Sequence, residues 1–370
     1  MKIVVNCFPI TDKRTGIGHY AYQLLHALAR LEEADLQLLF ARDAGARRAF
    51  AGEGVKIIEA PLLARQSLKR IAWENLVLPR LLRERGADIY FSPDYVIPMT
   101  RLPCPAVLTI HDLAFITLPG TNNRRYGTYL RLTVPAAARK AAGVIAISDY
   151  TKGEVVRLLG VREEKVRRIY YGRDEGFERP PDGAEEEEVC PYILFVGTLD
   201  RRKNIPRLLE AFSILKREGG FPHRLLLAGP RKYGYQEVLS TVRRLGLEGE
   251  VCEEGYVERD MMKGLYRRAS LLVLPSLHEG FGLPLLEAMA SGTPIAASNV
   301  TSIPEVAGDA AAYFDPLDVR GMAGVLRGLL EDAGLRASLV KRGRDRLRLF
   351  SWEKCARETM DLFGSLACGR

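Results

Sequence analysis

Ser276–Val306, SLHEGFGLPLLEAMASGTPIAASNVTSIPEV, is the stretch of this 370-residue chain that decides its fold. An apolar run over 269–275 leads into it and predicts a buried β-strand. A loop with two glycines and a proline follows, and LLEAMA then begins a helix that Ser291 and Gly292 end. A second short apolar strand over Pro294–Ala297 completes a strand–loop–helix–strand unit, which is typical of a parallel α/β sheet.

The loop and the first helical turn of this unit form a predicted anion site. Backbone N–H groups at a helix N-terminus lack partners and carry the positive end of the helix dipole, which suits a phosphate. Glu279 in the loop and Glu287 in the helix are good acceptors for hydroxyl groups, so we expect them to hold ribose or sugar diols beside the phosphate. The alternative is an ordinary strand–loop–helix unit with a surface Glu and a second Glu that favours the dipole.

The segment EGFGLPLLEAMASGTPIAAS, residues 279–298, resembles the E-x7-E segment of retaining GT-B-fold glycosyltransferases, the glycosyl transferases group 1 family. The resemblance covers essentially the whole chain and is strongest over 195–306. It implies an α/β GT-B fold, with two Rossmann-like domains facing across a cleft and a C-terminal helix crossing back to the N-terminal domain. We expect an N-terminal acceptor-binding domain over 1–179 with a closing helix over 352–370, a linker over 180–190, and a nucleotide-sugar-binding domain over 191–351.

Composition agrees with a two-domain globular protein. Hydrophobic residues make up 47% and charged residues 27% of a chain that is too long for one ordinary core. We find no apolar run of transmembrane length and no secretion signal, so we expect a cytoplasmic protein. The six cysteines form no C-x-x-C pair, and this argues against a disulfide framework or a zinc site.

The net charge of +8 is unevenly placed along the chain. Residues 1–179 contain 28 Lys and Arg against 19 Asp and Glu, so the basic surplus lies in the first half. Such a bias suggests an anionic partner there: a phosphate-bearing acceptor, an anionic membrane surface or nucleic acid. We expect no nucleic acid, because the basic residues are not interleaved with a stacking or groove-binding motif.

The basic stretch 64–85 reads as one amphipathic helix with Trp73 and with Pro79 inside it. A basic amphipathic helix with a tryptophan can lie on an anionic bilayer. The alternative is a helix that packs on a sheet and exposes a solvated basic face.

Two further segments of the first half have residues that suit a ligand site. Gly16 and Gly18 follow the first predicted strand, and we expect them to let a helix N-terminus approach a phosphate from the opposite domain; simple turn glycines are the alternative. His111 follows the strand over 106–109, at the end where ligands bind in open α/β sheets. The alternative is a bystander His beside a helix-capping Asp112. The segment IHDLAF resembles the family's acceptor-side segment, whose His faces the donor sugar.

Arg202 and Lys203 lie at a strand-to-helix turn in the second half, in GTLDRRKN. Compact positive charge and fork-like donors at close range suit a diphosphate; solvated basic loop residues are the alternative. The stretch resembles the family's donor-binding segment, which implies that Gly197 and Thr198 also lie at the donor. Thr198 departs from an arginine common there, so the phosphate contacts rest more on Arg202 and Lys203.

Other donor contacts are implied by the resemblance alone. The turn at Tyr256 and Val257 meets the nucleotide base, mostly through its backbone. Glu287 binds the ribose diol, and Glu279 fixes the donor sugar. The backbone N–H groups that assist Glu279 belong to Phe281, Gly282 and Leu283.

The resemblance also implies a mechanism. Lys203 and Arg202 stabilise the departing diphosphate, His111 orients or charge-balances the sugar, and the anomeric configuration is retained. No metal and no cofactor is expected beyond the donor substrate, because cationic side chains and helix dipoles take the place of a metal. On this basis Glu279→Ala is expected to lower turnover far more than stability.

The sequence thus predicts a hexosyltransferase that uses a nucleotide-diphosphate sugar, with GDP-mannose preferred because GTL-x-x-RKN and IHDL resemble a mannosyltransferase-like branch. The expected acceptor is a glycan or a lipid-linked intermediate of surface polysaccharide or lipopolysaccharide, and the expected place of reaction is the cytoplasm or the inner face of the cell membrane. Two alternatives stay open. One is a GT-B-fold phosphorylase or sugar-nucleotide epimerase, and the other is a non-catalytic protein that binds a membrane surface.

Overall fold

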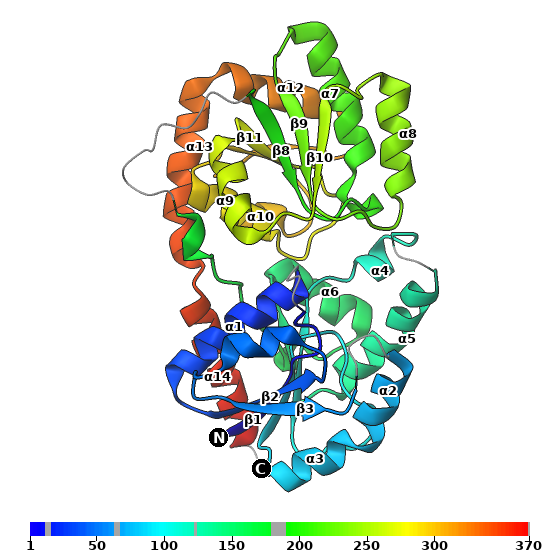
Figure 1. Cartoon of the computed structure of the whole chain (residues 1–370), viewed down its shortest axis with the longest axis vertical. Coiled ribbons are helices and arrows are strands. Elements are labelled where there is room, and N and C mark those ends of the chain that lie inside the picture. The colour runs from blue at the N-terminus through cyan, green and yellow to red at the C-terminus, as the bar shows by residue number, and fades with distance from the viewer. Residues whose placement is uncertain (12–15, 63–66, 122–123, 179–189, 369–370) are drawn as a thin grey trace. The chain divides into compact units, whose positions relative to one another are not determined.

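The computed structural model of the chain describes residues 1–11, 16–62, 67–121, 124–178 and 190–368 (Figure 1). Its contacts divide it into two compact units. The first consists of Met1–Leu113, Thr128–Gly172 and Phe350–Arg370, and the second of Ala114–Gly127 and Arg173–Leu349. The chain therefore passes between the units four times, after Leu113, Gly127, Gly172 and Leu349. The predicted linker over 180–190 lies outside the described residues, except for Cys190.

The first unit is built on a seven-stranded parallel sheet with the order β3-β2-β1-β4-β5-β6-β7. Several strands are buried throughout, which explains why they read as continuous apolar runs in the sequence. The strands are β1 Lys2–Asn6, β2 Asp35–Ala41, β3 Lys56–Ala60, β4 Ile89–Ser92, β5 Ala106–Ile110, β6 Gly143–Ala146 and β7 Val166–Arg168.

The helices of the first half of the chain are α1 Ile17–Leu31, α2 Ser67–Leu76, α3 Leu78–Arg85, α4 Ala114–Thr117, α5 Arg124–Lys140 and α6 Asp149–Leu159. The stretch 64–85 was predicted as one helix; its described part, 67–85, is two helices, so that prediction was wrong, and residues 64–66 lie outside the described residues. Pro79 occupies the first turn of α3, where a missing N–H and a fixed φ are tolerated. A proline inside a continuous helix would instead remove a hydrogen bond and clash with the preceding turn.

The C-terminal helix α14, Trp352–Ala367, packs on the first unit against α1 and β4, as the resemblance implied. The rings of Phe363 on α14 and Phe91 on β4 lie 5.2 Å apart between centroids. At Gly143 a Cβ atom would lie 3.0 Å from Leu366 Cδ1, so this glycine permits the close approach of α14.

The second unit is built on a six-stranded parallel sheet with the order β10-β9-β8-β11-β12-β13. Its core lies between the sheet, α7 and α12, around residues such as Phe195, Phe212 and Leu326. The strands are β8 Tyr192–Val196, β9 Arg224–Ala228, β10 Val251–Gly255, β11 Leu271–Leu274, β12 Ile295–Ser298 and β13 Ala312–Phe314. The helices are α7 Ile205–Gly219, α8 Tyr235–Leu245, α9 Arg259–Arg268, α10 Leu283–Ser291, α11 Ile303–Ala307, α12 Val319–Glu331 and α13 Ala333–Arg346.

In each parallel sheet there is one strand from which the chain continues first to one side and later to the other. β1 lies between β2 and β4, and β8 lies between β9 and β11, so the connections leave to opposite sides at these strands. Ligands of open α/β sheets bind outside the carboxyl ends of the strands at such a switch point. We therefore expect ligand-binding residues in the loops after β8 and β11 in the second unit, and after β1, β4 and β5 in the first.

Candidate functional site

The loops after β8 and β11 are joined by hydrogen bonds. The N–H of Leu277 donates to the carbonyl of Arg202 at 2.9 Å, and the Asn204 amide donates to the carbonyl of Pro275 at 3.1 Å. Asn204 has a left-handed backbone with φ of 57°, and its amide also donates to Pro316 O at 2.8 Å. This side chain therefore fixes the turn that carries Arg202 and Lys203.

The single turn of 3-10 helix at Arg201–Lys203 begins with a side-chain cap. Asp200 Oδ1 accepts from the N–H of Arg202 at 3.0 Å, and the Thr198 hydroxyl donates to Asp200 Oδ2 at 2.6 Å. Thr198, where the family commonly has an arginine, thus orients the residue that caps the basic turn. This contact gives Thr198 a structural part in the site.

Glu279 forms an ion triad with Lys203 and Arg202. Its Oε1 lies 2.5 Å from Lys203 Nζ, and its Oε2 lies 3.0 Å from Arg202 Nη1. The Ser276 hydroxyl also donates to Oε1 at 2.6 Å, and Arg202 donates to the carbonyl of His278 at 3.1 Å. Both Lys203 and Glu279 are buried, so the triad is held in an environment of low effective dielectric constant.

Attraction to the two cations decides the charge state of Glu279. Burial by itself would raise the pKa of this carboxyl, but Lys203, Arg202 and the hydrogen bonds from Lys203 and Ser276 outweigh it and lower the pKa to about 2. Glu279 is therefore a carboxylate throughout the neutral pH range.

The loop that carries Glu279 is also supported from the chain after β12. The N–H of Glu279 donates to Thr301 Oγ1 at 3.1 Å, and the Ser302 hydroxyl donates to the carbonyl of Glu279 at 2.9 Å. Gly282 caps α10 with φ of 93°, and Leu283 is the first residue of that helix. Phe281 is buried beside them.

Glu287 on α10 has a different set of partners. The Tyr266 hydroxyl donates to its Oε2 at 2.7 Å, and Arg259 Nη1 lies 3.2 Å from its Oε1. Arg259 also contacts Asp174 Oδ2 at 2.6 Å, so it links α10 to the chain that enters the second unit. Burial, with Glu287 adding to it, raises the pKa of Tyr266, which therefore stays a hydroxyl donor. The two glutamates predicted around one donor thus belong to two polar clusters of the second unit.

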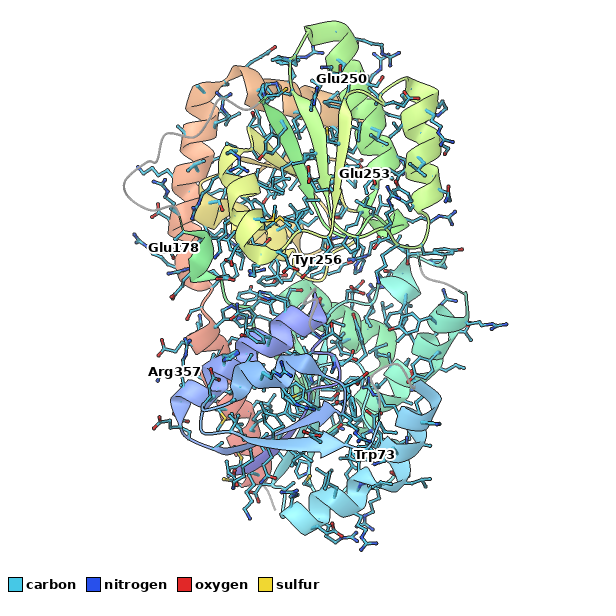
Figure 2. The ribbon with its side chains drawn as sticks, viewed as in Figure 1. Trp73, Glu178, Glu250, Glu253, Tyr256 and Arg357 are labelled. Carbon is cyan, nitrogen blue, oxygen red and sulfur yellow. The ribbon has the colours of Figure 1, made fainter. Side chains whose placement is uncertain are left out.

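The remaining donor-site predictions lie along the same edge of the sheet. A Cβ atom at Gly197 would lie 3.2 Å from Lys203 Cε, so this glycine leaves room for the lysine. Tyr256 and Val257 follow β10, at the far side of the sheet from β11, and Figure 2 shows Tyr256 just past the end of that strand.

His111 lies at the carboxyl end of β5 in the first unit, with both ring nitrogens engaged. Nε2 lies 3.0 Å from the carbonyl of Pro93, and Nδ1 contacts the hydroxyl of Tyr171. A carbonyl only accepts, which assigns the proton to Nε2 and makes Tyr171 the donor to Nδ1. Burial lowers the pKa of His111, so the ring is neutral at neutral pH. Of the two roles expected for His111, orienting the sugar or balancing its charge, a neutral ring fits the first.

The glycines before α1 have separate structural reasons. Gly16 caps α1 with φ of 50°, and a Cβ atom at Gly18 would lie 2.8 Å from the carbonyl of Pro9. Gly18 is therefore required for close packing against the chain after β1, and this requirement is independent of any role in binding a phosphate. Residues 12–15 of the predicted glycine loop lie outside the described residues.

Several site residues were missed from the sequence. Ser276 could have been found from its place three residues before Glu279, where a hydroxyl reaches the carboxylate. Tyr171 lies where the family usually has an asparagine-glycine-valine turn, and that departure was its signal. Arg259 and Tyr266 carry no local signal, because they reach Glu287 only through the packing of α9 on α10.

The described residues were also searched for metal-binding groups and for membrane-spanning helices. Among them, no group of three or more His, Cys, Asp and Glu side chains is arranged to hold a metal ion. In the same part of the chain, every helix is too short or too polar to cross a bilayer.

Known proteins resemble this chain along its whole length. Family models for glycosyl transferases group 1 and glycosyltransferase family 4 match residues 178–346 and 14–177. The O-antigen chain mannosyltransferase B of Escherichia coli is 31% identical, over 98% of this chain and 99% of that protein. The O-antigen chain mannosyltransferase RfbU of Salmonella typhimurium is 24% identical, over 88% and 90%. The structure of sucrose-phosphate synthase from Thermosynechococcus elongatus, 21% identical, superposes with a TM-score of 0.81 and full coverage of both chains.

Two Rossmann-like parallel sheets, a basic turn after β8 and an E-x7-E segment after β11 define the class of GT-B glycosyltransferases. The chain belongs to the glycosyl transferases group 1 family, and its first half matches the glycosyltransferase family 4 model. It is a glycosyltransferase.

Proposed function

We propose that this enzyme transfers a mannosyl group from GDP-mannose to a glycan or lipid-linked acceptor in the synthesis of a surface polysaccharide such as O-antigen. The observation that carries the proposal is the buried triad of Glu279, Lys203 and Arg202 at the switch point of the second unit. The O-antigen mannosyltransferases among its relatives support the choice of mannose and of the acceptor class. The reaction takes place at the cytoplasmic face of the membrane that carries the acceptor.

The cations of the triad bind the diphosphate of the donor. In the ligand-free protein Lys203 and Arg202 share one counter-ion, Glu279, so one positive charge of the triad is left over. An incoming diphosphate takes over these two cations, since it offers more negative charge at the same short range. Removing one well-placed donor to a developing charge typically costs a factor of about 10²–10³ in turnover.

The carboxylates bind hydroxyl groups of the donor. Released from the cations, Glu279 accepts hydrogen bonds from the sugar, and the N–H groups of Phe281, Gly282 and Leu283 lie nearby in its loop. Glu287 already accepts from Tyr266 and Arg259, and its remaining lone pairs accept from the ribose diol. Gly197, Thr198, Tyr256 and Val257 complete the nucleotide end of the site.

The transfer proceeds with retention and without a metal. The bond between the anomeric carbon and the diphosphate oxygen breaks while the acceptor hydroxyl adds to the same face of the sugar. The acceptor's proton passes to the departing phosphate oxygen, so no enzyme carboxylate acts as nucleophile. Lys203 and Arg202 stabilise the negative charge that develops on the leaving group. His111 orients the sugar as a neutral ring.

The test begins with saturation-transfer NMR of the purified protein against GDP-mannose and a panel of other nucleotide sugars. Transfer to a soluble oligosaccharide acceptor is then measured, and the anomeric configuration of the product is read by NMR. Glu279→Gln and Lys203→Met should each lower kcat by at least 100-fold. Glu210→Gln, which removes the partner of Arg244 on the same unit, is the matched control and should leave kcat within twofold.

Three results would overturn parts of the proposal. Selective binding and transfer of a different sugar would replace GDP-mannose as donor. A product of inverted configuration would exclude same-face attack. Loss of transfer in EDTA that a divalent cation restores would exclude a metal-independent reaction.

A further inference from the structure

Glu287 is fixed by two donors, one on each of its carboxylate oxygens. Arg259 Nη1 donates to Oε1 at 3.2 Å, and the Tyr266 hydroxyl donates to Oε2 at 2.7 Å. Both donors lie on α9 and Glu287 lies on α10, so the packing of these two helices sets the plane of the carboxylate. Each oxygen of a carboxylate can accept more than one hydrogen bond. Glu287 can therefore accept from two adjacent hydroxyl groups while both of its donors stay in place.

Arg259 is itself held from two sides. Its Nε lies 2.6 Å from Asp174 Oδ2, and its guanidinium carbon lies 4.7 Å from the centre of the Phe177 ring. A guanidinium that is engaged by two carboxylates and stacked on an aromatic face has little freedom to change its orientation. The position of Arg259 against Glu287 is therefore set in the ligand-free protein.

Phe177 supports the second donor as well. Its ring packs edge-on against the ring of Tyr266, with centroids 5.6 Å apart and an angle of 76° between the planes. Phe177 is fully buried, and the hydroxyl of Ser291, one helical turn after Glu287 on α10, donates to its carbonyl at 3.4 Å. Both donors to Glu287 thus pack on the same aromatic ring.

Asp174 and Phe177 belong to one short stretch of chain. It consists of residues 173–178, which follow the passage out of the first unit after Gly172, and it is here called the entry segment. The entry segment binds Arg259 through Asp174 and supports both donors through Phe177. The orientation of the Glu287 carboxylate therefore depends on contacts with this segment.

The charge of this cluster is opposite to that of the triad. Asp174 and Glu287 share one cation, Arg259, so one negative charge is left over, whereas the triad has one positive charge left over. A nucleoside diphosphate has anionic phosphates beside a ribose whose hydroxyl groups donate to a carboxylate. The two clusters match these two parts, and the reversed orientation would bring the phosphates to a like charge.

We propose that Arg259 and Tyr266 are positioning residues that hold Glu287 for the two ribose hydroxyl groups of the donor, and that Asp174 acts through Arg259. Without Arg259 the carboxylate can rotate, and the two hydroxyl groups no longer meet both of its oxygens. The inference rests on the proposed function in one respect, the binding of ribose by Glu287. It adds the residues that make this carboxylate discriminate between ribose and deoxyribose.

The test compares the affinities of GDP and 2′-deoxy-GDP for the full chain by isothermal titration calorimetry. Wild type should bind GDP about tenfold or more tightly than 2′-deoxy-GDP, because a hydrogen bond to a charged group contributes about that factor. Arg259→Met keeps the aliphatic stem but removes every donor, and should lower this ratio to below about threefold. A merely structural defect would weaken both nucleotides alike and leave the ratio unchanged.

Tyr266→Phe is the second variant. It keeps the ring that packs on Phe177 and leaves every charge in place, so it keeps the test decisive if Arg259→Met does not fold. It should also lower the ratio of the two affinities to below about threefold, because Oε2 of Glu287 loses its donor.

Asp174→Asn tests the indirect step. Asparagine keeps Oδ1, which accepts from the N–H of Gly176 at 2.9 Å, but it removes the charge that holds Arg259. The ratio should fall by about threefold. The double variant Asp174→Asn, Arg259→Met should match Arg259→Met alone, because two residues that act through one contact are not additive.

Arg267→Met is the matched control. Arg267 lies on the same helix as Arg259 and donates to the carbonyl of Glu178 in the entry segment at 2.9 Å (Figure 2). Among the described residues it forms no hydrogen bond or ion pair with Asp174 or Glu287. The variant should keep the wild-type ratio. An equal fall in Arg267→Met would assign the effect to general attachment of the entry segment and would overturn the proposal.

The remaining outcomes separate this inference from the proposed function. An unchanged ratio in both Arg259→Met and Tyr266→Phe, or a wild-type protein that binds GDP and 2′-deoxy-GDP equally, would overturn the inference and leave the triad's chemistry standing. UDP and 2′-deoxy-UDP are measured in parallel. Binding of UDP in place of GDP would contradict GDP-mannose as donor, and the uridine pair would then test the same three residues. Binding of neither pair would contradict both proposals.

Discussion

Tyr171 decides the state of His111 at the scale of single residues. Its hydroxyl donates to Nδ1, and its ring lies 4.7 Å from that of Tyr20 and 5.9 Å from that of Trp352. Burial raises the pKa of Tyr171 well above its ordinary value, so it remains a donor. A neutral, fixed imidazole follows from this one hydroxyl and the carbonyl of Pro93.

Replacing Tyr171 by Phe should raise the pKa of His111, because a hydrogen bond to an unprotonated nitrogen favours the neutral ring. Long-range ¹H–¹⁵N NMR should show a proton on Nε2 in the wild type and a higher titration midpoint in the variant. The acid limb of kcat should move to higher pH while KM for the donor stays the same. Tyr20→Phe is the control, since it removes a hydroxyl bonded to Thr109 but keeps the ring that packs on His111 and leaves both hydrogen bonds of His111 in place. An unchanged titration of His111 in Tyr171→Phe would contradict this assignment.

The turn after β8 and the loop after β11, which are distant in sequence, are joined by an ion pair. Lys203 and Glu279 are 76 residues apart, and their pairing joins the turn after β8 to the loop after β11. From the family resemblance, Glu279→Ala is expected to reduce turnover far more than stability. The burial of the triad changes that expectation, because removing Glu279 leaves two cations without a counter-ion.

Glu279→Gln should destabilise the ligand-free protein by roughly 3–5 kcal/mol at pH 7, measured by urea unfolding. In the wild type the Glu279 carboxyl has a pKa of about 2, below the value of about 4.3 for a glutamate in an unfolded chain. The carboxylate therefore stabilises the folded state fully above about pH 5. That contribution disappears as the pH falls toward 2, and the difference between wild type and variant should shrink accordingly. A nucleoside diphosphate should raise the melting temperature of the variant more than that of the wild type.

The surface pair between Glu210 and Arg244 provides the comparison for Glu279→Gln. Its members are partly exposed, and Glu210→Gln should cost less than about 1 kcal/mol. Equal stability of wild type and Glu279→Gln at neutral pH would show that the triad is not an ion pair in solution.

Features of the fold and the site were predictable where they depend on residues close together in the sequence, and were missed where they depend on contacts between distant segments. The buried strands were readable because parallel strands are apolar throughout, and the helix after Gly282 was readable from its glycine and proline. The break between α2 and α3 was missed because a proline inside an apolar period permits either a kink or a new helix. Arg202, Lys203 and Glu279 were chosen as neighbours of one ligand, but their pairing with each other depends on the register of two loops. The position of Arg70 over the ring of Phe8 could not be predicted, because Phe8 is 62 residues away and gives no signal in the helix itself.

At the scale of the whole molecule, the segments Tyr171–Gly172 and Ser351–Trp352 lie against each other where the chain passes between the units. A Cβ atom at Gly172 would lie 2.1 Å from the backbone nitrogen of Trp352 and 2.4 Å from its Cγ. Backbone cannot move aside as a flexible side chain can. The first unit therefore requires glycine at position 172.

Gly172→Ala should lower the stability of the first unit by about 1–3 kcal/mol through overpacking at the start of α14. Gly153→Ala is the matched control, since Gly153 lies within α6 with no atom near its Cβ position, and there alanine should be neutral or stabilising by up to about 1 kcal/mol. Thermal unfolding gives the two stabilities, and hydrogen exchange in α14 shows where protection is lost. Similar behaviour of the two variants would show that Trp352 adjusts to the added methyl group.

The packing of α14 on the first unit also bears on how the protein is made. Translation produces the strands of the first unit early, but α14, whose Phe363 packs on Phe91, leaves the ribosome only after the entire second unit. The second unit is almost continuous in the chain and can finish folding while the seat of α14 is still open. During translation, the apolar surface of the first unit that contacts α14 therefore stays exposed until α14 has been synthesised. A ribosome-stalled chain that ends near residue 349 should bind chaperones through this surface.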